Sequence, residues 1–356
     1  MSLYLLLPLP ALVAYLWHPR LTRISLLSVW AAVSIGMIFL MPIGSRDYTI
    51  YLRDFDNINA LSLGELWQQD PLYGSAVWVF GHFGGTGETF YPLLASVALF
   101  VKLTALGRLT GSSSLATLLY MCSYFFLHEF TQIRAGLAIG IWMHALADLN
   151  RSRFRYVVLT ALASLIHVQA VLGLLVFALQ PLTRSRQASR VAVLVTLLVV
   201  AATSTMLFDR WGYSVLAAIP DPRTEVYLAL AAEELWVRPN PFSVMSLLAF
   251  GTALLGLRQR TNLQVKNGDA TTHAIYLSLL LGSCALSLLS SISVAAFRVS
   301  EHFFALLPVG LWLAACRNRS TPRYPAVLWV LAALFAYVFL FHSPYLLDPA
   351  TGEPNE

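Results

Sequence analysis

Two residues that a bilayer core disfavours, Arg134 and His167, lie inside strongly hydrophobic stretches of this chain. Such residues are retained in membrane segments when they face a partner or a water-filled cavity. A basic turn at Arg151, Arg153 and Arg155 separates them along the chain. If that turn lies at one membrane face, both residues rise from it towards the opposite face. The spacing therefore predicts that they meet at one depth, and we interpret the meeting point as the active site.

Arginine at this depth indicates phosphate chemistry. Its guanidinium stays charged in any environment and offers a planar fork of donors that suits phosphate. Arg134 and Arg298 are expected to be buried or nearly so, and Arg46, beside Asp47, is a third candidate. Helix starts near Thr131 and Arg298 would add their positive dipole ends. Together these features predict a phosphate or diphosphate site at the outer boundary between membrane and water.

A base is also needed if a hydroxyl group attacks a substrate at this site. Histidine titrates near neutral pH, so His167 is the favoured base, and the carboxylates of Asp47, Glu88 and Glu301 are the alternatives. Other polar and aromatic side chains expected on the same outer side are candidates for substrate binding: Tyr48, Tyr51, Asp70, Tyr73, Gln132, Gln169, Trp211 and His302.

Structural roles for the same residues stay open at this point. Arg134 could form an ion pair with Glu129 or Glu88. Arg298 and Glu301 are three residues apart on one helical face and could pair with each other. His167 could be a packed, hydrogen-bonded core residue.

Composition excludes a soluble domain. The chain is 58% hydrophobic and 12% charged, whereas soluble domains carry about 25% charged residues. The apolar stretches have helical length and lack the alternation of an outer-membrane barrel. The net charge of +5 comes from short loop clusters, which indicates membrane topology and no nucleic-acid partner. The three cysteines are not at metal-ligand spacing, and the HEFTQ run lacks the second histidine of a zinc motif, so no metal or cofactor is expected.

The elements that must position these residues are membrane helices. We expect an all-α polytopic bundle of about 11–12 segments in one domain, residues 1–356, with outer loops at 44–88 and 208–240. The expected segments are 2–18, 24–43, 89–107, 113–128, 131–148, 155–167, 169–181, 190–207, 241–257, 273–295, 298–316 and 324–341.

Two regions of the chain predict broken or re-entrant helices. Segments 155–167 and 169–181 are short, and both outer flanks are basic, so two short helices meeting near His167 fit better than one long tilted helix. Non-helical backbone at that depth requires surrounding protein or a wet cavity. The run Leu72–Phe83 is too short to span a membrane and is expected to form an interfacial or re-entrant helix.

Lysine and arginine set the expected orientation, because cytoplasmic loops are enriched in both. Alternate loops hold most of the 23 basic residues and are placed in the cytoplasm, which leaves both termini outside. Those loops carry Arg20/Arg23, Lys102/Arg108, Arg151/Arg153/Arg155, Arg184/Arg186/Arg190, Arg258/Arg260/Lys266 and Arg317/Arg319/Arg323.

Five short motifs in order suggest a family. An outer loop of the form R–G–x–D–x–x–x–Y is approximated by Arg46–Tyr51, without a spacer between Arg and Asp, and an acidic-Pro-x-Tyr element follows at Asp70–Tyr73. An Ile-Arg-x-x-Leu-Ala helix start lies at Ile133–Ala138. A helix ending in histidine at Ser164–His167 and an Arg-x-x-x-aromatic helix at Arg298–Phe303 complete the set. In these motifs the chain resembles the EpsG-like proteins, a branch of the Wzy-type bacterial polysaccharide (O-antigen and exopolysaccharide) polymerases.

The resemblance implies a membrane glycosyltransferase, with an architecture similar to that of the GT-C enzymes. Such a protein, at the periplasmic face of a bacterial inner membrane, would transfer a glycan from undecaprenyl diphosphate onto another lipid-linked repeat unit. Its partners would be the lipid-linked donor and acceptor, membrane lipid and a chain-length regulator. Paired arginines could replace a divalent ion, so the reaction is expected to be metal-independent.

Two other functions are consistent with the same residues. A flippase or transporter would also present buried arginines, but it should show internal repeats and polar residues through the full membrane depth. An O-antigen ligase, or another transferase that depends on a lipid carrier, would use the same donor. The sequence determines neither the sugar, the linkage, the stereochemical outcome nor the oligomeric state.

The predicted orientation can be tested by labelling single cysteines with a membrane-impermeant maleimide in intact spheroplasts. We expect a cysteine at Ser62 to be labelled from outside and a cysteine at Ser152 to be protected until the membrane is opened. The unsubstituted protein controls for the native cysteines. Labelling of the Ser152 position from outside would overturn the orientation.

Overall fold

The computed structural model describes residues 6–18, 20–45, 47–62, 64–68, 70–183, 191, 195, 243–262, 270–289, 293–316 and 325–341. The secondary-structure elements in these ranges are helices, and an isolated β-bridge joins Arg20 and Ser113. The expected all-α class is therefore confirmed. The chain clusters into two compact units, residues 1–174 with 311–356, called unit 1, and residues 175–310, called unit 2.

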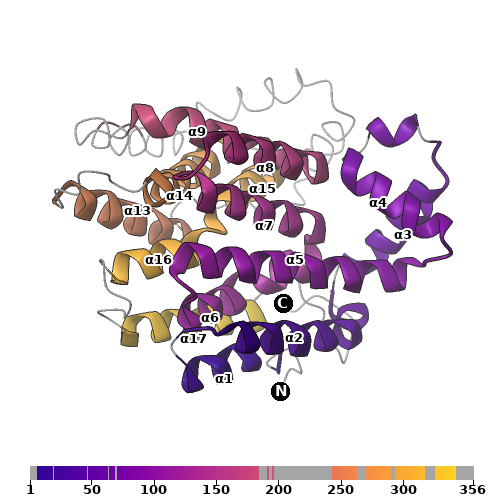
Figure 1. The fold of residues 1–356 in the computed structure, drawn as a ribbon, viewed down its shortest axis with the longest axis horizontal. Coiled ribbons are helices and arrows are strands. Elements are labelled where there is room, and N and C mark those ends of the chain that lie inside the picture. The colour runs from indigo at the N-terminus through magenta and orange to yellow at the C-terminus, as the bar shows by residue number, and fades with distance from the viewer. Residues whose placement is uncertain are drawn as a thin grey trace. The chain divides into compact units, whose positions relative to one another are not determined.

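Unit 1 is built around a layer of long helices that lie side by side (Figure 1). The layer consists of α2 (Arg23–Gly44), α5 (Gly87–Thr110), α7 (Ile133–Asp148) and α8 (Arg153–Ile166). Three further helices pack together beside it: α1 (Leu9–Trp17), α6 (Ser114–Ser123) and α17 (Pro325–Phe341).

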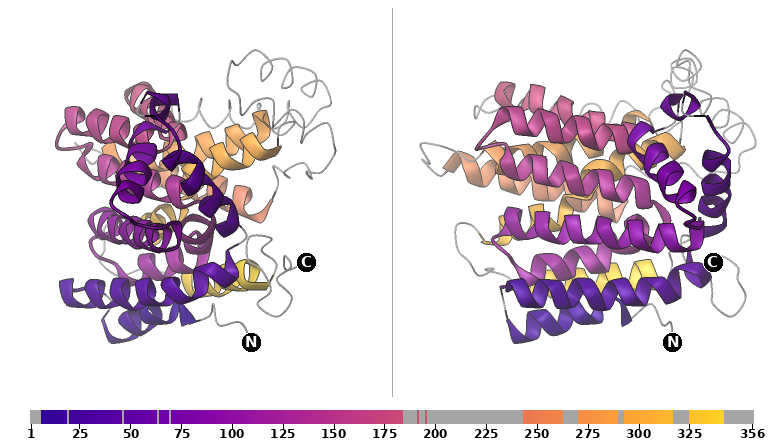
Figure 2. Two further views of the ribbon diagram at one scale, coloured as in Figure 1. Left: turned by 90° about the vertical axis from the view of Figure 1, so that its right-hand side faces the viewer. Right: turned by 45° about the vertical axis from the view of Figure 1, so that its right-hand side comes forward.

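Helices α5 and α7 form the most extensive contact of this layer and run in the same direction (Figure 1; Figure 2). Thr104 Oγ1 lies 3.1 Å from His144 Nε2, and further along Arg108 forms an ion pair with Asp148. Because each pair is separated by the same number of residues, the two helices must be parallel. Small residues on α7 permit the close approach. A Cβ atom added at Gly140 would lie 3.0 Å from Lys102 Cγ.

The first outer loop folds into three short helices, α3 (Tyr48–Asn59), η2 (Glu65–Gln68) and α4 (Pro71–His82). Helix α3 forms because its apolar residues recur at helical spacing and bury one face against α5. Proline at the first position of α4 fits a helix start, where its missing N–H is not needed. The short helix expected at 72–83 is thus confirmed, whereas α3 was not anticipated. Both α3 and α4 gather at one end of the long layer (Figure 1).

The chain breaks at His167, as the basic flanks predicted. Helix α8 ends at Ile166, His167 is extended (φ −155°, ψ 114°), and a 3₁₀ turn, η4 (Val168–Val171), leads into α9 (Leu172–Leu182). The hydroxyl of Tyr156, at the start of α8, donates to the carbonyl oxygen of Gly173 at 2.7 Å. The chain therefore turns back along α8 after His167.

A second break precedes α7. Helix α6 ends at Ser123, and a π-helical turn, η3 (Phe126–Thr131), brings the chain to Gln132 (φ −114°, ψ 52°). Helix α7 then begins at Ile133. The predicted boundary between segments 113–128 and 131–148 is confirmed, and the structure adds the π turn. π-Helical turns of this kind are frequently found at functional sites.

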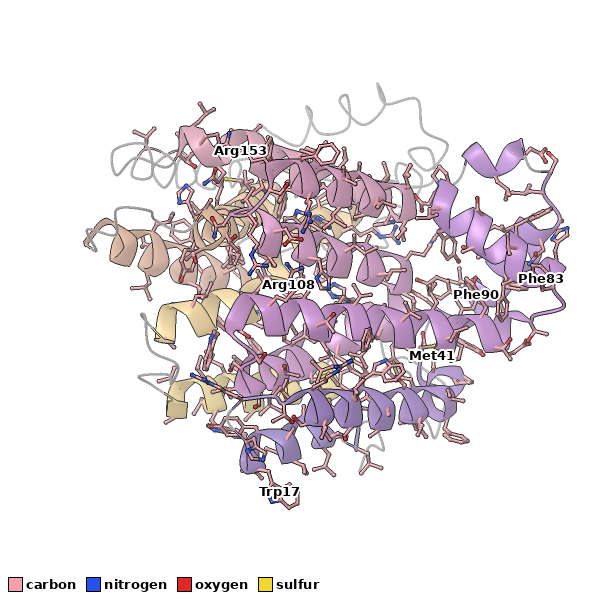
Figure 3. The ribbon with its side chains drawn as sticks, in the orientation of Figure 1. Trp17, Met41, Phe83, Phe90, Arg108 and Arg153 are labelled. Carbon is pink, nitrogen blue, oxygen red and sulfur yellow. The ribbon has the colours of Figure 1, made fainter. Side chains whose placement is uncertain are left out.

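Basic residues collect at the end of unit 1 that lies away from α3 and α4. Figure 3 shows Arg108 and Arg153 at that end, opposite Phe83 and Phe90. This grouping of basic residues agrees with the predicted basic loops. The assignment of this end to the cytoplasmic face of the membrane stays a prediction. The prediction that Lys102 belongs to a cytoplasmic loop is wrong, because Lys102 lies within α5 and its side chain is fully buried.

Unit 2 contains α13 (Val244–Asn262), α14 (Ala270–Leu288) and α15 (Ser293–Phe304), with α14 packed against the other two. The expectation of one segment at 298–316 is wrong, because α15 ends at Phe304 and α16 (Leu307–Cys316) starts a new helix. The segment expected at 190–207, the outer loop 208–240 and the tail from Ser343 lie outside the described residues.

Three helical stretches in the described part of the chain are long and apolar enough to cross a membrane: Arg23–Pro42, Gly87–Thr110 and Ala270–Leu288. Shorter apolar helices are Ser114–Ser123, Val168–Leu182, Val244–Leu257 and Ala326–Phe335. This set is compatible with a membrane helix bundle that contains broken helices.

Close packing of α7 predicts a measurable sensitivity at Gly136. A Cβ atom there would lie 2.7 Å from the carbonyl oxygen of His128 and 3.0 Å from Lys102 Nζ. We expect Gly136→Ala to destabilise the purified protein by about 1–3 kcal/mol, as overpacking does. Gly251→Ala on α13 is the matched control, since its Cβ would meet no atom within 4 Å, and its effect should be within about 1 kcal/mol. Thermal unfolding in detergent measures both, and equal stability of the two variants would contradict the packing.

Candidate active site

Arg134 stands in the first turn of α7, at the end of unit 1 occupied by α3 and α4. Its guanidinium lies 3.6 Å from an oxygen of Asp70 and 3.7 Å from an oxygen of Asp54. The guanidinium carbon also lies 4.8 Å from the ring centre of Tyr73, a cation–π distance. About a quarter of the side chain (26%) is exposed, so a ligand could still reach it.

Asp70 connects the segments of the site. It is 3% exposed and immediately precedes α4. Its Oδ1 atom accepts the backbone N–H of Val168 at 3.3 Å, and its Oδ2 atom lies 3.8 Å from His167 Nδ1 as well as 3.6 Å from Arg134. One buried carboxylate thus holds the start of α4, the start of α7 and the break after α8 together.

His167 reaches this cluster because the backbone is extended there. Its side chain is 13% exposed, and Nε2 lies 3.2 Å from the amide oxygen of Gln169. An amide can present either its oxygen or its NH₂ group to the ring, so Gln169 can serve a protonated or a neutral imidazole. The predicted meeting of Arg134 and His167 is therefore observed, with Asp70 between them.

Three tyrosines support the start of α7. The hydroxyl of Tyr51 accepts the backbone N–H of Ile133 at 3.0 Å, which satisfies one of the unpaired donors of the helix start. The hydroxyls of Tyr73 and Tyr91 lie 3.0 Å apart. Burial raises the pKa of Tyr73 to about 12 and raises that of Tyr51 as well. Both groups on α3 and α4 are therefore neutral hydrogen-bonding phenols near neutral pH.

Sequence reasoning missed Asp54. Its side chain is 36% exposed, so it is the accessible carboxylate beside Arg134, in contrast to buried Asp70. The spacing in the sequence could have indicated Asp54, because it follows Tyr51 by three residues and residues three apart share one face of a helix. Recognition of α3 as a helix would have placed Asp54 with Tyr51.

Three other predicted candidates, Asp47, Gln132 and Glu88, also belong to unit 1. Asp47 is half-buried just before α3, and Gln132 is half-buried at the break before α7. Glu88 is exposed beside Tyr48, whose pKa is raised by burial and, less strongly, by that carboxylate. Glu88 also lines a half-open cavity of about 300 Å³ between α3 and the start of α5.

The structural alternative proposed for Arg134 needs a correction. Arg134 does lie near carboxylates, but they belong to Asp54 and Asp70. Glu129, named as a partner from the sequence, forms an ion pair with Lys102 instead.

Three candidates belong to unit 2, on α15. Arg298 is exposed and lies in the sixth position of the helix, so the expected helix start near it is wrong, as is its predicted burial. Glu301 and His302 are buried. Arg46 and Trp211 lie outside the described residues. Among those residues that are described, no group of three or more His, Cys, Asp and Glu side chains gathers at metal-binding distances.

The EpsG family model matches residues 23–347, nearly the whole chain. The chain belongs to the EpsG family. No curated protein and no solved structure matches it. Membership of the EpsG family, together with the apolar helices, makes this chain a membrane protein with a function related to polysaccharide polymerisation.

Proposed function

We propose that this EpsG-family protein is a polysaccharide polymerase that works at the outer, periplasmic face of a bacterial inner membrane. It transfers a growing glycan from undecaprenyl diphosphate onto a second lipid-linked repeat unit. The observation that carries this proposal is the cluster of Arg134, Asp70 and His167, which places a partly exposed cation beside a titratable ring at one end of the helix layer.

Arg134 is proposed to bind the diphosphate of the donor. The start of α7 supports this role, because backbone N–H groups and the helix dipole favour an anion there. Two carboxylates lie beside the guanidinium, so one of them must move away for an anion to bind there. Asp54 is the exposed one, and ion pairs at exposed positions are weak. Asp70 is buried and stays to orient the guanidinium.

His167 is proposed to act as the general base. It takes the proton of the acceptor hydroxyl while that oxygen forms a bond to the anomeric carbon of the donor sugar. The bond between this carbon and the phosphate oxygen breaks, and its electron pair leaves with undecaprenyl diphosphate. Asp70 faces Nδ1 and stabilises the ring when it carries the proton. A guanidinium supplies the positive charge that the leaving diphosphate needs, so we propose a metal-independent reaction.

The acceptor and the glycan are proposed to contact the polar groups around this cluster. Gln169 and the tyrosines on α3 and α4 offer hydrogen bonds to sugar hydroxyls. Arg46, Arg298 and the carboxylates of Asp47, Glu88 and Glu301 remain further candidates from the sequence. A chain-length regulator is a proposed partner.

One observation favours an enzyme over a flippase. The partly exposed ionisable groups around Arg134 gather at one end of unit 1, whereas the charges of Lys102 and Glu129 deeper in the layer are fully buried and paired with each other, so they offer no open path for a lipid-linked sugar. A ligase would use the same donor site as a polymerase, but its product would differ. A ligase transfers the glycan to a lipid acceptor that does not serve as the next donor.

Substitution of Arg134 tests the diphosphate role. Arg134→Lys keeps the charge but loses the fork of donors, and we expect polymer formation from purified lipid-linked repeat units to fall by about 10²-fold or more. Asp54→Asn is the matched control, because it removes the exposed partner and should leave KM for the donor unchanged or lower. Full-length polymer from a well-expressed Arg134→Ala protein would exclude Arg134 from the site.

Substitution of His167 tests the proton transfer. His167→Gln keeps a hydrogen-bonding amide but cannot take up a proton at neutral pH, so we expect the rate to fall by about 10²–10⁴ while the folded protein still binds the lipid-linked unit. His167→Ala should be as inactive. If the role is structural, Gln restores activity and Ala lowers thermal stability instead. A near wild-type rate of purified His167→Gln would remove the base assignment.

A further inference from the structure

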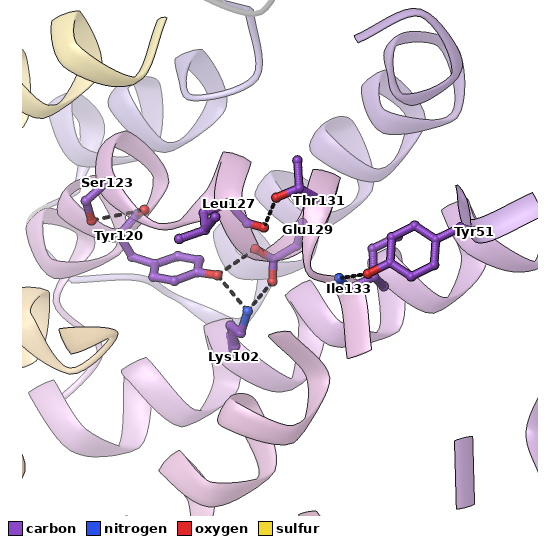
Figure 4. A network of polar contacts seen from close by, with 8 residues as sticks. All are labelled: Tyr51, Lys102, Tyr120, Ser123, Leu127, Glu129, Thr131 and Ile133. Carbon is purple, nitrogen blue, oxygen red and sulfur yellow. Dashed lines mark hydrogen bonds and ion pairs between the residues drawn. The ribbon is translucent and has the colours of Figure 1, made fainter. Parts of the chain in front are cut away.

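A closed ionic network lies beneath the site in the core of unit 1. Lys102 Nζ donates to Glu129 Oε1 at 2.6 Å and to the hydroxyl of Tyr120 at 2.9 Å, and that hydroxyl donates to Glu129 Oε2 at 2.6 Å (Figure 4). Each of the three groups therefore contacts the other two. The side chains of Lys102 and Glu129 have no exposed surface.

Such a network is not an obvious way to stabilise a membrane helix bundle. Removing two charges from water costs free energy that their mutual attraction often fails to recover, and apolar residues of similar volume can be equally stabilising. A buried charge pair is therefore better explained where it fixes a geometry that apolar packing leaves loose.

The network fixes the segment that leads to Arg134. Glu129 lies in the π turn η3, on the chain only five residues before Arg134. At the end of that turn the N–H of Gln132 donates to the carbonyl of Leu127, and the carbonyl of Gln132 accepts the N–H of Gly136 in α7. The π turn and the first turn of α7 are thus hydrogen-bonded in series.

Lys102 also holds α7 directly. Its side chain runs across α7 at Gly136 and Gly140, where added Cβ atoms would come within 3.0 Å of Lys102 Nζ and Cγ respectively. Gly136 lies two residues after Arg134. The same lysine therefore contacts the helix that carries Arg134 and binds the turn that precedes it.

Tyr51 completes the positioning from the other side. Its hydroxyl accepts the N–H of Ile133, next to Arg134, as Figure 4 shows beside the ionic network. Ser45 adds a hydrogen bond from its hydroxyl to the carbonyl of Phe130 in the π turn. The start of α7 is consequently held from the core by Lys102 and from the outer helices by Tyr51.

We propose that Lys102, Glu129 and Tyr120 are positioning residues that set the place of the Arg134 guanidinium between Asp54 and Asp70. The part of this inference that concerns the donor diphosphate rests on the proposed function. The positioning of the Arg134 guanidinium does not depend on that function. The network acts through the π turn and touches no substrate.

The test uses a charge-balanced double variant, Lys102→Met with Glu129→Gln. Either single change would leave an unpaired buried charge and could prevent folding, whereas the double variant leaves none. Ser96→Ala is the matched control, because Ser96 lies on the same helix and its hydroxyl bonds to Ser34 on α2, away from α7. Thermal unfolding of the purified full-length proteins first establishes that the variants are folded.

Two readouts follow. The first is the rate at which phenylglyoxal modifies Arg134, measured by peptide mass spectrometry, which does not depend on enzyme activity. The second is KM for the lipid-linked donor. We expect the folded double variant to expose Arg134 to faster modification and to raise KM on the order of tenfold, because small misplacements of a binding group are costly. Ser96→Ala should change neither.

A third comparison separates positioning from general stability. Adding Arg134→Lys to the double variant should weaken donor binding little beyond Arg134→Lys alone, because both changes remove the same interaction. A folded double variant with unchanged Arg134 modification would overturn the proposal. Faster modification with an unchanged KM would retain the positioning of Arg134 and overturn the proposed role of Arg134 in donor binding.

Discussion

The buried carboxylate of Asp70 is the interaction on which the candidate site depends. It faces the guanidinium of Arg134 and the imidazole of His167 and accepts a backbone N–H after the α8 break. A carboxylate that is 3% exposed is stable only with such partners. The same requirement that stabilises Asp70 therefore brings three segments, far apart in the sequence, to one end of the helix layer.

Breaks in the helices are the second constraint, and hydrogen bonding decides where they can occur. Backbone groups in an apolar surrounding must be paired, so a helix can stop only where other donors and acceptors replace its own. At Ile133 the replacement is the hydroxyl of Tyr51, and at Val168 it is Asp70. Each break is supported by a residue of the outer segment, Tyr51 in α3 or Asp70 just before α4, which explains why the site forms where these helices meet the layer.

Two kinds of charge occur in this fold, and their exposure separates their roles. Lys102 and Glu129 are completely buried and saturate one another, which suits a fixed support. Arg134 and Asp54 are partly exposed and only loosely paired, which suits exchange with a ligand. The sidedness of basic residues assigned Lys102 to a cytoplasmic loop, because the sequence does not show that its partner is Glu129, 27 residues away.

The sequence by itself determined the all-α membrane class, the break at His167, the short helix at Pro71–His82 and the meeting of Arg134 and His167 at one place, because each follows from local hydrophobicity or from the sidedness of basic residues. Only the tertiary structure decided which carboxylates face Arg134, that Glu129 belongs to Lys102, and that Arg298 lies exposed in the middle of α15. Hydropathy reports how much of a helix is apolar but not its rotation about its own axis. The partner of a buried charge depends on that rotation, and packing against neighbouring helices sets it.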